Sequence, residues 1–268
     1  MSEDNAPNDS DGDADVREDI AEQPPKDALI IFNNPEKKGK CRLGLEDYMP
    51  NSTSRILLSA MPGCGKRNLI FNILHRMIPP PSVVHLVHTD ADCTEYDHIS
   101  EMGIPLLVYT PDNFPTIQNI DDPFGEEEVE PTDEEKKTTK KPLQNPLVIV
   151  DEVTTDALGR VGCHRFERLV NHGCTHRNAT LICSIQSLMN IPTKARRGFN
   201  HFAIWKQADK ALNKLIADRA SIKAETLEDM FELCKDKYDF IYIDLDSAHD
   251  SPMRYRLNFI EPIDIRPN

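Results

Sequence analysis

The segment Ala60–Arg67, with the sequence Ala-Met-Pro-Gly-Cys-Gly-Lys-Arg, constrains this chain more than any other stretch. It follows the short apolar run Arg55–Ser59, which predicts a buried strand. After it, apolar residues recur with helical spacing over 68–77, which predicts a helix with one buried face. A glycine-containing turn between a strand and a helix is where backbone N–H groups and a helix N-terminus bind phosphate. The segment therefore predicts a phosphate-binding loop.

This loop follows the P-loop template G-x-x-x-x-G-K-[ST] with two departures. Gly65 and Lys66 match, and Gly63 lies at a common inner glycine position. Ala60 replaces the first glycine, which is a mild change. Arg67 replaces the Ser or Thr that holds Mg²⁺, and a guanidinium has no acceptor atom with which to coordinate a cation. The candidate nucleotide-binding residues are Pro62, Gly63, Cys64, Gly65, Lys66, Arg67 and Asn68.

An acidic pair follows the P-loop in the order that P-loop ATPases require. The apolar run Leu147–Val150 predicts a strand, and Asp151 and Glu152 come directly after it. In such ATPases the aspartate holds Mg²⁺ and a neighbouring carboxylate polarises the attacking water. In isolation, two carboxylates at a strand end are often only solvated, but their place after a P-loop favours catalysis. Asp151 is thus predicted to hold Mg²⁺, helped by water and the nucleotide.

Polar residues around the next predicted strand, Ala179–Ile185, are candidates for contact with the γ-phosphate. Gln186 follows this strand and is predicted to touch the γ-phosphate or to orient the attacking water. Arg177 precedes the strand and ranks ahead of Arg196 and Arg197 as the arginine that completes a neighbouring subunit's site. The alternative for each of these residues is a solvated surface side chain without a role in catalysis.

Cysteine usage indicates a reducing compartment. The seven cysteines are dispersed, without a C-x-x-C pair, and their number is odd, which fits free thiols better than a disulfide framework. The run His172, Cys174, His176 resembles a metal-ligand cluster, but its spacing is not that of a usual zinc finger. We therefore expect no metal there.

Further apolar runs alternate with helical patterns along the chain, and these runs are apolar throughout. That pattern predicts a mainly parallel sheet covered by helices on both faces. The predicted fold class is α/β, a P-loop NTPase of the ASCE, RecA-like type. Beyond those named above, the predicted strands are 28–32, 82–87, 104–109, 202–205 and 239–244, and the predicted helices are 163–171, 209–219 and 227–234.

The net charge of −14 is concentrated in two segments. Residues 1–27 carry ten acidic and two basic residues, and 121–145 carry nine acidic residues and four lysines. The remainder holds 26 acidic and 25 basic residues, so its charge is about −1. We expect 1–27 to be a disordered acidic tail and 28–268 to be one ATPase domain with an acidic low-complexity insertion at 121–145. The overall acidity does not exclude a nucleic-acid partner.

Targeting signals are not evident in the sequence. No apolar run approaches the roughly 20 residues that span a bilayer, so we expect no membrane partner. The first residues are acidic, unlike those of a signal or transit peptide. The expected location is intracellular.

The order and spacing of these motifs resemble the genome-packaging ATPases of large and mid-size DNA viruses, of the poxvirus, virophage and Polinton-like type, in the FtsK–HerA superfamily. The resemblance covers roughly residues 54–260. Its most discriminating part is His176–Pro192, which contains a strand, a glutamine and an Ile-Pro pair. The other matching segments are 63–66, 148–152, 196–200, 202–206, 238–244 and 255–258.

This resemblance implies a motor that uses ATP and Mg²⁺, assembles as a homo-oligomeric ring and translocates double-stranded DNA into a preformed capsid. Lys66, Asp151, Glu152 and Gln186 would have the roles given above, and a capsid or portal protein would be a partner, with association to the virion a further implication. Arg67 departs from the family pattern. The basic residues expected to meet DNA phosphates are Lys194, Arg196, Arg197, Lys206, Lys210 and Lys214.

Two other functions stay open at this point. The first is a nucleotide-binding assembly protein whose P-loop holds ATP without efficient hydrolysis, which Arg67 favours and Glu152 disfavours. The second is a helicase or another nucleic-acid-dependent translocase of the same superfamily, which strand unwinding on a forked substrate would distinguish from a packaging motor.

Overall fold

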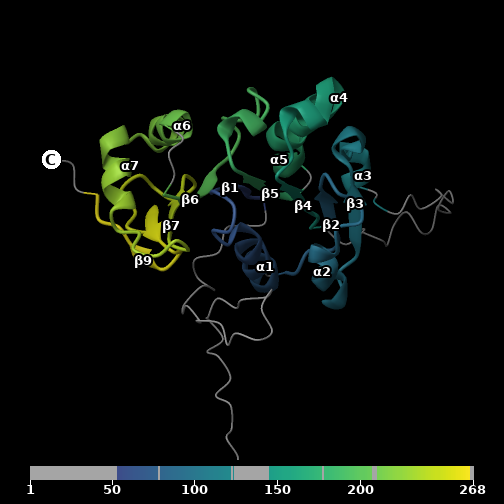
Figure 1. Cartoon of the computed structure of the whole chain (residues 1–268), viewed down its shortest axis with the longest axis horizontal. Coiled ribbons are helices and arrows are strands. Elements are labelled where there is room, and N and C mark those ends of the chain that lie inside the picture. The colour runs from purple at the N-terminus through teal and green to yellow at the C-terminus, as the bar shows by residue number, and fades with distance from the viewer. Residues whose placement is uncertain are drawn as a thin grey trace, which may run out of the picture.

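The computed structural model describes residues 53–77, 79–121, 123, 145–176, 178–206 and 210–265. In this part of the chain nine strands form one sheet, in the order β3-β2-β4-β5-β1-β6-β7-β8-β9 (Figure 1). The strands are β1 (Arg55–Ser59), β2 (Val84–Val87), β3 (Leu106–Tyr109), β4 (Leu147–Asp151), β5 (Thr180–Ile185), β6 (His201–Trp205), β7 (Phe240–Asp244), β8 (Tyr255–Leu257) and β9 (Glu261–Pro262). The helices are α1 (Lys66–Arg76), α2 (Asp97–Glu101), α3 (Ile117–Asp121), α4 (Thr155–Arg168), α5 (Cys174–His176), α6 (Lys210–Ala220) and α7 (Ala224–Phe231).

The sheet is mainly parallel, which confirms the predicted α/β fold class. Strands β3, β2, β4, β5, β1 and β6 pair in parallel, and β7 to β9 are added antiparallel at one edge. The central strands are buried on both faces, and most of their residues are apolar on both faces as well. The strands predicted in the described ranges are all present, with ends that shift by two residues or fewer.

Helices cover both faces of the sheet (Figure 1). On one face, Leu69 and Ile73 of α1 pack with Ile56 and Leu58 of β1, and Tyr96 and Ile99 join them. On the other face, α4, α6 and α7 pack against the alternate side chains of the same strands. Each fully buried Leu or Ile contributes about 1.5–3 kcal/mol relative to exposure. These two layers fix the ends of the strands, on which the candidate site is built.

Helix α4 begins eight residues before the predicted start at 163. Thr154 caps it, because its hydroxyl accepts a hydrogen bond from the Ala157 N–H at 3.2 Å. Gly159, at φ 58°, interrupts the helical backbone, and this glycine is why the sequence pattern concealed the first turn. Beyond Arg168 the chain continues as a wider π-helical turn over Leu169–Gly173.

Several predictions from the sequence lie outside the described residues. These are the acidic tail 1–27, the strand 28–32 and nearly all of the insertion 121–145. Within the described ranges, six cysteines carry free thiols, as expected, and Trp205 is core. No helix in those ranges has the length and apolar character needed to cross a bilayer.

The strand order brings the two predicted motifs together. The P-loop follows β1 and the acidic pair ends β4, and only β5 lies between these two parallel strands. Gln186 follows β5 directly. Because the carboxyl ends of parallel strands meet at one edge of a sheet, three segments far apart in the sequence converge on one site.

A buried histidine on β2 gives the fold a testable pH dependence. His85 has no exposed surface, its Nδ1 lies 3.1 Å from the Tyr109 hydroxyl, and burial lowers its pKa from 6.5 to about 4. The unfolded chain binds a proton below pH 6.5 that the folded chain binds only below about pH 4, so acid favours unfolding. We expect the free energy of unfolding to fall by about 3 kcal/mol between pH 7 and pH 4 on account of His85.

Denaturant unfolding of the wild type and of His85→Gln across this pH range measures the effect. Carboxylates titrate in both proteins, so the difference between their unfolding free energies at each pH gives the contribution of His85. That difference is expected to change with pH; parallel curves would contradict the prediction.

Candidate functional site

The P-loop turns through two glycines with left-handed backbone angles. Gly63 has φ 75° and Gly65 has φ 92°, a region that side chains rarely adopt. Gly65 is the N-cap of α1, and Lys66 is the first residue of this helix. The N-terminus of α1 and the positive end of its dipole therefore face the loop, as an anion site requires.

Lys66 is buried between the loop and the acidic pair, with only 6% of its side chain exposed. Its Nζ donates to the carbonyl oxygen of Ala60 at 3.0 Å and lies 2.9 Å from Oε1 of Glu152. A buried ammonium needs such partners, because desolvation without them costs several kcal/mol. The P-loop lysine is thus ion-paired with Glu152, the predicted catalytic glutamate.

Glu152 is held from two sides in a strained backbone conformation. Its φ is 53°, which costs a non-glycine residue about 1–3 kcal/mol, and its N–H donates to the Ser184 carbonyl oxygen at 2.9 Å. The second carboxylate oxygen, Oε2, accepts a hydrogen bond from Nε2 of Gln186 at 2.9 Å. Gln186 therefore orients Glu152, while Lys66 neutralises it.

Arg67, the residue that departs from the template, pairs with the other member of the acidic pair. Its Nη2 lies 3.4 Å from Oδ2 of Asp151, and its Nη1 pairs with Oε2 of Glu95. The guanidinium carbon lies 5.3 Å from the centre of the Tyr96 ring, a cation–π contact. Burial would lower the pKa of Arg67, but Tyr96, Asp151 and Glu95 more than offset it, so the pKa is raised.

Tyr96 completes this arrangement from the 3₁₀ turn η2 (Thr94–Tyr96), which precedes α2. Its hydroxyl donates to Oδ2 of Asp151 at 2.8 Å, the same oxygen that faces Arg67. Burial, and next the negative charge of Asp151, raise the pKa of Tyr96 well above 10. The phenol therefore stays protonated and serves as a hydrogen-bond donor.

The described residues do not fit the Mg²⁺ site that the fold class implies. The usual ligands are the P-loop Ser or Thr and the aspartate at the end of the acidic strand. Here the first is Arg67, which has no acceptor atom. The second, Asp151, has 4% of its side chain exposed, and its Oδ2 already faces two donors. A cation that binds this oxygen would have to displace both donors.

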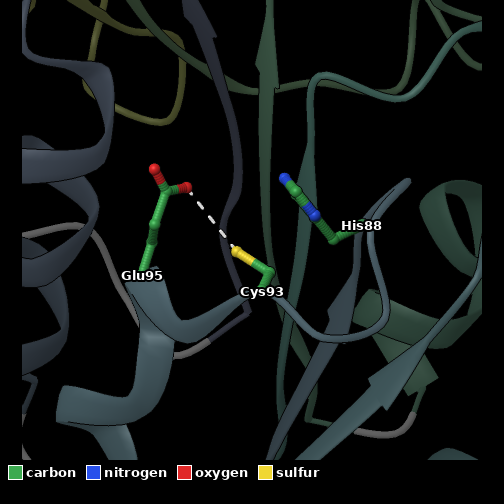
Figure 2. Close-up of side chains that lie close together, drawn as sticks. All are labelled: His88, Cys93 and Glu95. Atoms are coloured by element: carbon green, nitrogen blue, oxygen red, sulfur yellow. Dashed lines mark hydrogen bonds between the residues drawn. The ribbon is translucent and has the colours of Figure 1, made fainter.

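A cluster of metal-ligand types lies beside this site, after β2. Atoms of His88, Cys93 and Glu95 that could bind a metal lie within 4.8 Å of one another, and Figure 2 shows the three side chains converging. The Cys93 thiol donates to Glu95 at 3.6 Å, and burial raises its pKa, which favours the thiol over the thiolate that metals bind. Glu95 is exposed and also pairs with Arg67, so this one member of the cluster holds the guanidinium from the solvent side.

The structure brings together most of the predicted site residues. Lys66, Glu152 and Gln186 form one connected network, and Arg67 and Asp151 form an ion pair at the neighbouring positions of the same two segments. Pro62 is exposed, and Cys64 and Asn68 are half-buried at the start of α1.

The arginines predicted to act in a neighbouring subunit's site are not part of this network. Arg177 lies outside the described residues, so its role stays a prediction. Arg196 is half-buried, and its Nε donates to the Ile191 carbonyl oxygen at 3.0 Å, within its own loop; Arg197 is exposed. Among the described residues, the groups able to hold a metal do not include His172, Cys174 and His176.

Tyr96 and Glu95 are functional candidates that the sequence pattern did not reveal. Both lie in a short turn without hydrophobic periodicity, and 55 residues separate Tyr96 from Asp151. Tyr238 is another, because its half-exposed ring lies 3.5 Å from where a Cβ on Gly65 would be. The P-loop and acidic motifs do not identify residues that other segments of the chain bring to the site.

The fold is similar to that of known NTPases. Genome packaging NTPase B204 from Sulfolobus turreted icosahedral virus 2, in complex with sulfate, gives a TM-score of 0.51 at 15% identity over 81% of this chain and all of that one. Its complex with AMPPCP gives 0.48 at 14% identity over 80% and 100%. The pCW3 conjugation coupling protein TcpA gives 0.43 at 14% identity over 71% and 57%. No protein-family model and no curated protein matches the sequence. At such identities the likeness shows the fold alone, an α/β P-loop NTPase.

The thiol of Cys64 in the P-loop is predicted to react faster than the buried thiols of Cys174 and Cys183. Cys64 is half-buried in the loop, whereas burial raises the pKa of Cys234 to about 11 and of Cys174 to about 12, and that of Cys183 further. Since the thiolate is the nucleophile, iodoacetamide should alkylate Cys64 at least about tenfold faster than Cys174 or Cys183. Peptide mass spectrometry over a time course measures the order. Earlier labelling of Cys174 would show that α5 does not pack as described.

Proposed function

We propose that this protein binds a nucleoside triphosphate, ATP, at the P-loop and hydrolyses it. The observation that carries this proposal is the connected network of Lys66, Glu152 and Gln186 at the ends of three strands, β1, β4 and β5. A strand cap of solvated carboxylates would not require a buried lysine. It would also not require a glutamate at positive φ whose carboxylate accepts a hydrogen bond from a neighbouring glutamine.

Binding of the triphosphate would release the general base. The phosphates would meet the N–H groups of the loop and the N-terminus of α1, and their negative charge would compete for Nζ of Lys66. Once Lys66 turns to the phosphates, the carboxylate of Glu152 loses its cation and can accept a proton from water. Gln186 still holds Oε2, so the base stays oriented.

Each residue then has a distinct role in phosphoryl transfer. Glu152 accepts the proton of the attacking water, and Gln186 positions Glu152 and reaches toward the γ-phosphate. Lys66 neutralises charge that develops on the phosphate oxygens. Arg177 remains our candidate for the arginine that a neighbouring subunit contributes, which would make hydrolysis depend on assembly.

We further propose that hydrolysis drives packaging of double-stranded viral DNA. The support is the resemblance of residues 54–260 to packaging ATPases, together with the shared fold of the genome packaging NTPase B204. On this proposal the protein acts as a homo-oligomeric ring inside the infected cell, with a capsid or portal protein as its partner. The alternative of a helicase or translocase would share the site and differ in the substrate that it moves.

DNA phosphates would meet exposed basic residues on one side of the chain. Lys194 and Arg197 are exposed in the loop before β6, and Lys210 and Lys214 are exposed one turn apart on α6. Lys206 already pairs with Glu232 at 2.8 Å, so its charge is partly matched. The lysines and arginine that have no such partner among the described residues are the stronger candidates.

A second candidate function is a nucleotide-locked assembly protein. The observation that favours it is the pairing of Arg67 with Asp151, because a site without its usual metal ligands is a poor catalyst. In that case ATP would stabilise the ring, and hydrolysis would be slow or absent. The intact network of Lys66, Glu152 and Gln186 favours the motor.

The first experiment is steady-state ATP hydrolysis with and without double-stranded DNA. We expect DNA-stimulated turnover, and in Glu152→Gln a loss of about 10²–10⁴-fold, because the general base is removed. Glu228→Gln, an exposed glutamate on α7, is the matched control and should keep wild-type turnover. Lys66→Ala should lose nucleotide binding as well.

The outcomes separate the two candidates. Turnover that survives in Glu152→Gln would refute its role as the base. A wild type that binds ATP without hydrolysing it, at any DNA concentration, would favour the assembly protein. Unwinding of a forked duplex would favour the helicase.

DNA binding should weaken steeply with salt if the contacts are to phosphate. The logarithm of the binding constant should fall linearly with the logarithm of salt concentration, by about 0.9 per phosphate contact. Replacing both Lys194 and Arg197 with Gln should lower this slope by about 1–2. Arg160→Gln, which replaces an exposed arginine on α4, should leave it unchanged. Fluorescence anisotropy with duplexes of two unrelated sequences measures the slope, and salt-insensitive binding would contradict a phosphate interface.

A further inference from the structure

We propose that Arg67 takes the place of Mg²⁺ in this site, so that the protein binds its nucleotide in the metal-free form. The guanidinium, presented by the first turn of α1, would contact the β- and γ-phosphate oxygens that a metal ion bridges in other P-loop proteins. This inference rests on the proposed function, since it concerns the same nucleotide. It reverses the expectation that Asp151 holds the metal.

The first support is the matching of charges across the site. Two consecutive basic residues at the start of α1 face two consecutive acidic residues at the end of β4: Lys66 pairs with Glu152, and Arg67 pairs with Asp151. In the usual site the aspartate has no protein cation and is left to attract a divalent ion. Here its charge is already neutralised, so the attraction for Mg²⁺ is weakened.

The second support is that Arg67 is held firmly in this position. Asp151 and Glu95 form ion pairs with its two terminal nitrogens. The guanidinium carbon lies 5.3 Å from the centre of the Tyr96 ring. Tyr96 is fully buried, and its hydroxyl fixes Asp151 at 2.8 Å. Only 28% of the Arg67 side chain is exposed, which is a low value for a solvated surface arginine.

The third support is an unused donor. Nε of Arg67 is buried and has no hydrogen-bond partner among the described residues. A buried N–H without an acceptor is costly, and the guanidinium carries five N–H donors, more than its two ion pairs use. Phosphate oxygens are the acceptors that a guanidinium binds best, often through two parallel hydrogen bonds. The residue next to the P-loop lysine is where such oxygens are expected.

The test measures nucleotide binding rather than turnover. The full chain is titrated with a fluorescent ATP analogue in excess EDTA and again in excess Mg²⁺. We expect the wild type to bind with similar affinity in both. Arg67→Thr, which restores the template residue, should bind about tenfold or more weakly in EDTA, because a charge-assisted contact is lost. In Mg²⁺ its affinity should recover, since Asp151 is then free to hold the ion.

Two further variants make the result specific. Arg67→Lys keeps the charge without the planar fork, so its affinity in EDTA should fall between those of the wild type and Arg67→Thr. Arg160→Thr removes an exposed arginine from α4 and should behave as the wild type in both buffers. Circular dichroism confirms that each variant is folded.

Each outcome decides between the alternatives. Wild-type binding that appears only in Mg²⁺ would overturn the inference while leaving the proposed nucleotide site intact. Equal binding of the wild type and Arg67→Thr in EDTA would show that Arg67 is not the cation that replaces the metal. If nothing binds in either buffer, the proposed function itself fails, and the inference fails with it.

Discussion

The pairing of two cations with two carboxylates is the interaction on which the rest of the site depends. Lys66 and Arg67 open α1, and Asp151 and Glu152 close β4, with β5 between the strands that lead to them. These four charges would be costly to bury separately, and each is partly buried because its partner is present. The pairing thus links the P-loop to the acidic strand even before a nucleotide binds.

The sequence predicted the parts of the site that obey local rules. The P-loop lies between a buried strand and an amphipathic helix, and the acidic pair ends an apolar run, so both were visible as patterns. Tyr96 and Glu95 were not predictable, because they come from a short turn and reach Asp151 and Arg67 through the order of strands β2 and β4. The start of α4 was hidden for a different reason, a glycine at positive φ within the helix.

The chemistry of Arg67 follows from the sequence, but its consequence for Asp151 does not. That a guanidinium cannot coordinate Mg²⁺ follows from its donor atoms alone. Whether it leaves Asp151 free for the ion depends on where the side chain turns, which the sequence does not state. The structure turns it toward Asp151, with Tyr96 beneath the guanidinium and Glu95 beyond it. A departure from a motif is therefore best interpreted together with the residues that contact it.

A cation fixed to the chain has consequences that a free ion does not have. Mg²⁺ contributes two charges, whereas Arg67 contributes one, so less of the charge on the γ-phosphate would be neutralised and chemistry would need help from another cation. On the proposed function, an arginine from a neighbouring subunit would supply this charge and would couple hydrolysis to ring assembly. Arg67 also cannot leave with the product. Asp151 and Glu95 would compete with the diphosphate for its guanidinium and so favour product release.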